Sequence, residues 1–246
     1  HQQEISVQSL DTAFELYDSL LTSKPSSSFS SSAYFRLGEI QYKLLGDFDG
    51  AFNSYQAAKK SGGKSKLIKK IRLRIGDIHI AKGELNKAQN YFEKLGKIGD
   101  EFHYKYILSQ LFSGNIDTAS ILVEKAINKS VPIASDFNDL LELRTFISKF
   151  YQNGSDNDKN AFKLFIFGEF YLKQKKLTEA VASYTFIQNQ YPKSSISNDA
   201  ILREALIRLK LNQISEAFEL AEKLTHTKLA PTGLALLGEI NEKYIC

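Results

Sequence analysis

Apolar residues recur every three or four positions along most of this chain, which predicts a succession of amphipathic helices. The spacing also repeats on a longer scale. Counting from Gly46, residues 2, 5, 9 and 12 positions later are apolar, and the small Ala51 holds the second of these places. The same order follows Gly83, Gly114, Lys175 and Asn212, and places Ala88, Ala119, Ala180 and Ala217 where the first pass has Ala51. Five passes of one pattern indicate a repeat architecture.

Each repeat also has an upstream half, marked by a large residue followed by glycine. These pairs are Leu37-Gly38, Ile75-Gly76, Phe167-Gly168 and Leu237-Gly238. Each half is long enough for a helix of about 14 residues, and the glycine or polar residue between the halves predicts a tight turn. Glycines on first helices and alanines on second helices allow close approach beside bulky neighbours. We therefore expect antiparallel helix pairs joined by small-to-bulky contacts.

Residues 161–194 match the signature of a known family most closely. The matching positions are Leu164, Phe167-Gly168, Tyr171, Leu177, Ala180, Tyr184, Ile187 and Pro192. The chain resembles the tetratricopeptide-repeat family over most of its length. The resemblance is weaker at 100–131, which lacks the Leu-Gly pair, and at 198–230, where Glu204-Ala205 replaces it. It implies an all-α, right-handed superhelical solenoid of antiparallel helix pairs, with one inserted helix.

The repeat pattern predicts the domain organisation. We expect a partial repeat with only its second helix at 1–30, three repeats at 31–130, an inserted helix and polar loop at 131–160, two repeats at 161–230, and the first helix of an incomplete repeat at 231–246. The insert shows as an interval from Ala119 to Ala180 that is nearly twice the others.

One added helix would reverse the direction of the following repeat. We expect the polar loop Asn153–Asn160 to run back along the inserted helix and to restore the direction, which gives one continuous, kinked array. The alternative is a solenoid that splits near Val131 into two lobes. The chain contains no methionine, so we expect His1 to follow a removed leader or a cut in a longer protein. Further repeats or another chain would then cover the incomplete ends.

In the family, the second, fifth and ninth residues of a repeat face the concave side. Carried over to this chain, the resemblance implies the partner-binding residues Phe35, Glu39, Leu73, Asp77, Tyr104, Leu108, Phe162, Phe165, Glu169 and Leu202. Such an apolar groove with scattered acids suits a helix or an extended peptide with apolar anchors and a few bases. The alternative is that tight winding buries some of these side chains. The Lys and Asn clamp with which some family members hold chaperone tails is absent from these places.

The net charge of +4 is concentrated in one segment. Residues 59–74 contain eight bases and no acid, namely Lys59, Lys60, Lys64, Lys66, Lys69, Lys70, Arg72 and Arg74. An alternative function is therefore binding to an anionic surface, including peripheral contact with a membrane. Nucleic acid is disfavoured, because no aromatic residue is interleaved for base stacking.

No pattern in the sequence indicates catalysis. The four histidines are far apart and form no metal-ligand spacing, and no glycine-rich phosphate loop is present. His79 and His103 fall at packing positions of first helices. We therefore expect no enzymatic activity, no metal, no cofactor and no small-molecule substrate.

These observations predict a non-enzymatic scaffold that binds a peptide or another protein on its concave face. A regulatory or sensor array attached to a signalling protein is the alternative. The turn Tyr191-Pro192-x-Ser194 before Asp199-Ala200 is similar to bacterial envelope repeat proteins, such as the outer-membrane assembly lipoprotein and the TolA-binding coordinator. This similarity favours a bacterial envelope or secretion assembly, in the periplasm or at the inner face of the outer membrane, with the cytoplasm as the alternative.

Overall fold

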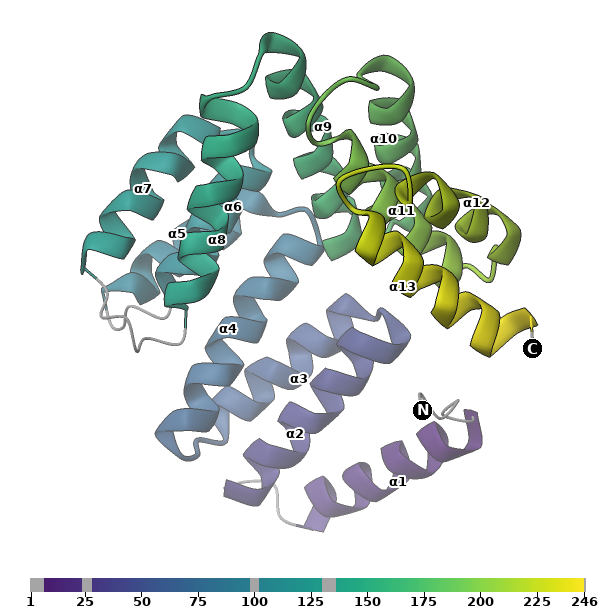
Figure 1. Cartoon of the computed structure of the whole chain (residues 1–246). Helices are drawn as coiled ribbons and strands as arrows, with labels where there is room; N and C mark the ends of the chain where they lie inside the picture. Colours follow the sequence, from purple (N-terminus) through teal and green to yellow (C-terminus); the bar gives the residue numbers. More distant parts are fainter. Residues whose placement is uncertain (1–6, 24–27, 98–101, 130–135, 246) are drawn as a thin grey trace. The chain divides into compact units, whose positions relative to one another are not determined.

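The computed structural model describes residues 7–23, 28–97, 102–129 and 136–245, and within these ranges every regular element is helical (Figure 1). The chain divides into two compact units, residues 1–106 and 107–246, and each is described by itself. The prediction of an all-α repeat architecture is confirmed. Over the described ranges, no helix combines the length and the apolar character that a bilayer crossing requires.

Unit 1 consists of helices, the first five of which pack on their neighbours in sequence order. They are α1 (Val7–Ser23), α2 (Ser28–Ile40), α3 (Phe48–Lys60), α4 (Ser65–Ala81), α5 (Leu85–Gly96) and the start of α6 (His103–Phe112). A π-helical turn, Gln41–Leu45, extends α2. Ala51, Tyr55 and Ala58 of α3 are buried against Ile71 and Ile75 of α4, and they form the centre of this unit.

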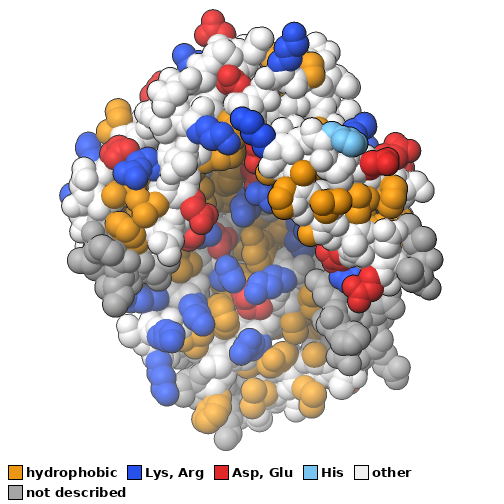
Figure 2. All heavy atoms as spheres, viewed as in Figure 1, with side chains coloured by type: hydrophobic (Ala, Val, Ile, Leu, Met, Phe, Trp, Pro, Cys, Tyr) orange, Lys and Arg blue, Asp and Glu red, His pale blue; other side chains and the backbone are white. Residues whose placement is uncertain are grey.

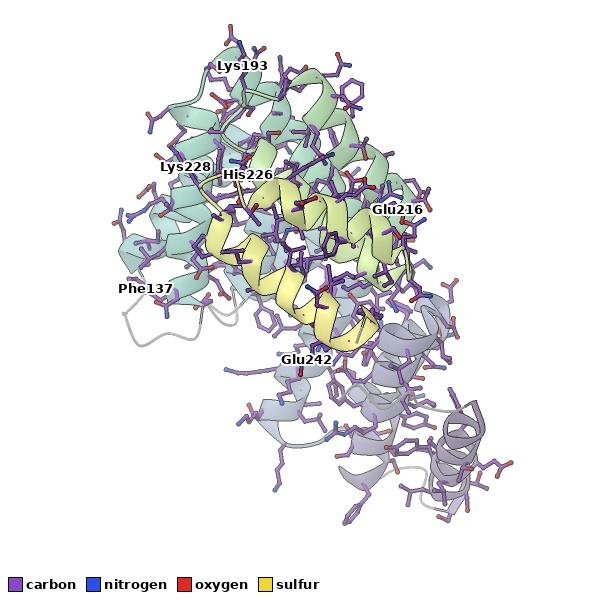
Figure 3. The ribbon with its side chains drawn as sticks, turned by 45° about the vertical axis from the view of Figure 1, so that its right-hand side comes forward. Phe137, Lys193, Glu216, His226, Lys228 and Glu242 are labelled. Carbon is purple, nitrogen blue, oxygen red and sulfur yellow. The ribbon has the colours of Figure 1, made fainter. Side chains whose placement is uncertain are left out.

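Unit 2 continues in the same way through seven further helices. They are α7 (Ile116–Lys129), α8 (Phe137–Ile147), α9 (Asp156–Lys173), α10 (Leu177–Gln190), α11 (Ser197–Lys210), α12 (Ile214–Leu224) and α13 (Ala230–Ile240). From α9 to α13 each helix packs on the next, and α8 packs on α7. Figure 3 shows α13 lying beside α12, with His226 and Lys228 in the loop that joins them.

The five residues from which the repeat was counted are all turn residues with a left-handed backbone. Their φ angles are 71° at Gly46, 76° at Gly83, 81° at Gly114, 60° at Lys175 and 58° at Asn212. A left-handed residue after the last helical residue is a common way to end a helix and satisfy its carbonyls. Lys175 and Asn212 adopt this conformation at some cost in strain, because their Cβ atoms disfavour it.

Glycines on first helices lie against aromatic rings on second helices, as the sequence predicts. A Cβ atom at Gly38 would lie 2.6 Å from Tyr55 Cε1, and one at Gly168 would lie 2.7 Å from Tyr184 Cε1. Gly76 faces Phe92 in the same manner. These three contacts have no room for a methyl group, so the glycines are required by packing rather than by a turn.

The expected loop of eight residues after the inserted helix is wrong. The inserted helix is present as α8, followed by a π-helical turn, Ser148–Gln152. Helix α9 then begins at Asp156, where Ser155 caps it and Asp158 completes a capping box. Ser and Asp three residues apart are a strong helix start, and this signal makes five of the eight residues of the polar segment the beginning of α9. The three residues Asn153–Ser155 are too few to run back along α8.

Candidate partner-binding faces

The first helices of unit 1 are joined by ion pairs on one face. Glu39 of α2 accepts a hydrogen bond from Arg74 Nε of α4 at 2.6 Å, and a second from Arg74 Nη2 at 3.3 Å. The Tyr55 hydroxyl donates to the same carboxylate at 2.7 Å. Burial alone would raise the pKa of Glu39, but the hydrogen bonds from Arg74, Lys43 and Tyr55 outweigh it and lower the pKa to about 2. Glu39 is therefore an ionised, fully partnered group.

The same face continues from α4 to α6. Asp77 accepts a hydrogen bond from Arg74 Nη1 at 3.1 Å and pairs with Lys105 Nζ of α6 at 2.8 Å. Tyr42 is close to these charges, and burial followed by the charge of Asp77 raises its pKa to about 12. Three first helices are thus linked by alternating charges.

Unit 2 repeats this arrangement. Glu169 of α9 pairs with Arg203 Nε of α11 at 2.8 Å and accepts a hydrogen bond from the Tyr184 hydroxyl at 2.8 Å. In both units the acid directly follows the glycine that contacts the aromatic ring, and the base stands on the next first helix. In each unit by itself we name this surface the first-helix face. It is defined by Glu39, Arg74, Asp77 and Lys105 in unit 1 and, separately, by Glu169 and Arg203 in unit 2.

The predicted partner-binding residues differ in their exposure. Asp77, Phe162 and Phe165 are buried, which is the alternative that the sequence left open. The others are partly exposed, namely Phe35, Glu39, Leu73, Tyr104, Leu108, Glu169 and Leu202. The three acids do not face a guest as free charges, because Arg74, Lys105 and Arg203 of the chain itself neutralise them. These three acids therefore do not require basic residues in the partner.

An open pocket of about 390 Å³ lies in unit 2, between α8 with its π-helical turn and the first turn of α11. It is lined by Leu141, Glu142, Thr145, Phe146, Lys149, Phe150 and Asp199. The ring of Phe146 contacts Phe150, Phe162 and Phe165 at centroid distances of 5.0, 5.2 and 5.5 Å. The two buried phenylalanines predicted as contacts thus support the wall of the pocket through Phe146.

The basic segment forms a surface around the α3–α4 connection. Figure 2 shows Lys and Arg side chains gathered over the region that α4 occupies in Figure 1. The six lysines of the segment are exposed, namely Lys59, Lys60, Lys64, Lys66, Lys69 and Lys70. Arg74, predicted as part of the same patch, instead turns to the first-helix face, because Glu39 and Asp77 lie on that side of α4.

The histidine at position 79 has a packing role. Its ring lies between Phe52 and Tyr91, at centroid distances of 5.5 and 6.0 Å, and its Nδ1 is 2.8 Å from Glu84 Oε2. Within the described residues, no group of three or more His, Cys, Asp or Glu side chains could hold a metal ion.

Sequence reasoning missed the ion pairs and the pocket. The ion pairs leave a recognisable signal, since a base follows the Gly-acid pair by about one repeat, as with Gly38-Glu39 and Arg74 or Gly168-Glu169 and Arg203. The pocket leaves none, because its lining joins the inserted helix to Asp199, about fifty residues away in the chain.

The stacked helix pairs with linked first helices define the class of protein, a helical-repeat protein. Two segments, residues 32–61 and 70–97, match family models described as the tetratricopeptide repeat. These two segments of the chain are therefore similar to tetratricopeptide repeats. No curated protein sequence matches the chain.

Solved structures of tetratricopeptide-repeat proteins are similar to the chain at low identity. YrrB, a TPR protein with an unusual peptide-binding site, is 13% identical, with 93% of this chain and 94% of that chain covered and a TM-score of 0.37. The TPR2AB domain of yeast Sti1 in complex with pHSP90 is 11% identical, with coverages of 87% and 100% and a TM-score of 0.38. TTC0263 of Thermus thermophilus is 15% identical, with coverages of 88% and 100% and a TM-score of 0.34.

Proposed function

We propose that this chain is a non-enzymatic scaffold that binds a peptide or a partner protein on its first-helix face. The supporting observation is the set of ion pairs that joins α2 to α4, α4 to α6, and α9 to α11. These pairs fix the spacing of neighbouring first helices before a partner arrives. A preorganised surface loses less conformational entropy on binding.

Apolar side chains on this face supply the contacts for the partner. Leu73 of α4 is half-buried, and Leu206 of α11 is 37% exposed. Because the acids beside them are already neutralised, recognition in unit 1 depends on apolar shape more than on charge. Partner surfaces of this kind are anchored by a few apolar side chains.

Affinity capture from the native source tests the proposal. We expect Leu73→Gln and Leu206→Gln to reduce the yield of the specifically captured protein at least tenfold. The control is Ile121→Gln, which changes a residue that is 57% exposed on the second helix α7. Circular dichroism verifies that all three variants fold. Equal loss in the control, or full capture by both face variants, contradicts the proposal.

We further propose a bacterial envelope or secretion assembly as the setting, supported by the sequence similarity around Tyr191–Ser194. In the structure, Ser194 has a packing role, since its hydroxyl donates a hydrogen bond to Asp158 at 2.7 Å. The motif therefore serves packing in any compartment. Fractionation of native cells tests the setting, and recovery in the cytoplasmic fraction alone contradicts it.

We also propose that further repeats or another chain cover α13. Leu234 is 61% exposed. Among the described residues, no atom outside the backbone of α13 itself lies within 4 Å of the Cβ position of Gly238, unlike the three glycines that contact aromatic rings. This side of α13 is shaped to receive a second helix. Leu234→Gln should leave the stability of the chain alone unchanged and weaken the contact that covers α13.

The exposed lysines support a second candidate function, binding to an anionic surface. Six exposed lysines lie in a segment without acids, and such a patch attracts anionic headgroups in a salt-dependent way. Sedimentation with phosphatidylserine vesicles at low and high salt tests it. Lys64→Gln with Lys66→Gln should release the chain, whereas Lys223→Gln with Lys228→Gln should not. Absence of binding at low salt contradicts this candidate.

A further inference from the structure

The pocket beside α8 exists because of the insert. Six of its seven lining residues belong to α8 and its π-helical turn, and only Asp199 comes from a regular repeat. A tetratricopeptide array without the insert would lack this wall. The pocket volume of about 390 Å³ lies within the range of small-ligand and side-chain sites.

The aromatic wall of the pocket is held in place by neighbouring rings. Phe146 contacts three other phenylalanines, and Phe150, Phe162 and Phe165 are all buried. Phe146 itself is partly exposed and lines the pocket. A fixed aromatic surface of this kind favours a flat or cationic group, because the ring face carries partial negative charge.

Asp199 adds a carboxylate without an ion-pair partner among the described residues. It is half-buried, and burial raises its pKa, against the opposing charges of Lys149 and Arg203. Neither base forms an ion pair with it. Arg203 pairs with Glu169, and Lys149 Nζ lies 4.1 Å from the centroid of the Phe150 ring. Glu142 is a second acid in the lining, so the acids of the pocket outnumber its single base.

We propose that this pocket receives an arginine side chain from a partner protein, with the guanidinium paired to Asp199 and stacked against Phe146. Arginine fits better than lysine, because its planar group pairs with a carboxylate through two hydrogen bonds and stacks on aromatic rings. An apolar residue beside this arginine would contact Leu141. The inference rests on the proposed scaffold function, and it assigns that function a second site, specific to the insert.

A fluorescent peptide, acetyl-Ser-Leu-Arg-Phe-Ser, is the probe, and its glutamine analogue is the matched control. Binding is measured by anisotropy with the full chain. We expect the arginine peptide to bind at least tenfold more tightly than the glutamine peptide, since a hydrogen-bonded charge pair has about this effect. Equal binding of the two peptides, or no binding of the arginine peptide at millimolar concentration, overturns the proposal.

Three variants locate the contact. Asp199→Asn should remove most of the preference for arginine, and Thr145→Trp should block both peptides by filling the pocket from an exposed position. Ile121→Gln, on α7 and outside the pocket lining, should change neither affinity. If Asp199→Asn leaves the ratio of the two affinities unchanged, the proposal fails. Loss of native partner capture in Leu73→Gln but not in Asp199→Asn or Thr145→Trp would refute the pocket while the scaffold function stands.

Discussion

The Tyr184 hydroxyl donates a 2.8 Å hydrogen bond to Glu169, across the hairpin formed by α10 and α9. The ring that makes this bond is also the ring that contacts Gly168. One tyrosine therefore fills the space left by the glycine and satisfies the acid that follows it. Tyr55 does the same for Gly38 and Glu39 in unit 1.

Tyr184→Phe should destabilise unit 2 by about 1–2 kcal/mol, because Glu169 loses one donor and keeps Arg203. Urea unfolding measures the change. In the hairpin of α4 and α5, Phe92 occupies the place of this tyrosine and has no hydroxyl. The acid of that hairpin, Asp77, is paired with Arg74 and Lys105 instead. Tyr244→Phe, at an exposed residue, is the control and should have no effect. Equal stability of Tyr184→Phe and wild type would show that the hydroxyl bond contributes nothing net.

Gly168 lies against an aromatic ring, whereas Gly238 has open space beside it, so alanine should affect stability differently at the two positions. Alanine favours a helix over glycine by about 1 kcal/mol, whereas overpacking a filled site costs about 1–3 kcal/mol. Gly168→Ala should therefore lower the unfolding midpoint, because its Cβ would lie 2.7 Å from Tyr184 Cε1. Gly238→Ala should leave the midpoint unchanged or raise it. If both substitutions had the same effect, packing against the ring would not explain why glycine recurs at this place in the repeats.

The hairpin repeat could be predicted from sequence because its signals are local. A left-handed turn residue fixes the origin, and the small residue Ala51 or Ala180 marks the crossing of two helices. The signal for the start of α9 is also local, since it is the capping box of Ser155 and Asp158. The polar composition of 153–160 nevertheless favours a loop. The prediction from composition is wrong here, because the capping hydrogen bonds start a helix at Asp156.

The sites depend on long-range pairing, and sequence periodicity specifies that only in part. Positions on first helices were identified, but periodicity does not tell whether Glu39 meets solvent, a guest or Arg74. Glu39 is paired within the chain because the next first helix carries a base, Arg74, within reach. The pocket depends on where the inserted helix lies against α11, which no repeat pattern specifies.

Glu39 makes the stability of unit 1 sensitive to acid. Its pKa in the folded chain is about 2, against 4.5 for an unperturbed glutamate, so the folded state holds fewer protons between these values. The stabilisation is complete above pH 4.5 and is lost as the pH falls toward 2, with an upper bound of about 3 kcal/mol. Glu39→Gln should flatten this part of the pH profile of unfolding. Glu93→Gln, on the exposed side of α5, should leave the profile as it is.

Asp158 joins the start of α9 to the loop before α11. One of its oxygens accepts hydrogen bonds from Ser194 Oγ at 2.7 Å and from the Ser195 backbone N–H at 2.9 Å, while the other accepts from Ser155 Oγ at 2.8 Å. Burial would raise the pKa of Asp158, but these hydrogen bonds hold it well below its usual value of 3.8. Its contribution is present above pH 3.8 and is lost as the pH falls below that value.

Asp158→Ala should therefore have two separable effects. Loss of the capping box should destabilise α9 by about 0.5–2 kcal/mol, and amide hydrogens of residues 194–197 should exchange faster because their loop loses its anchor. Hydrogen exchange with mass spectrometry resolves the two segments. Asp156→Ala is the control, since Asp156 lies in the same first helical turn, is exposed and makes none of these bonds. Faster exchange confined to α9 would show that Asp158 acts only as a capping residue, and that the loop before α11 is held by its own contacts.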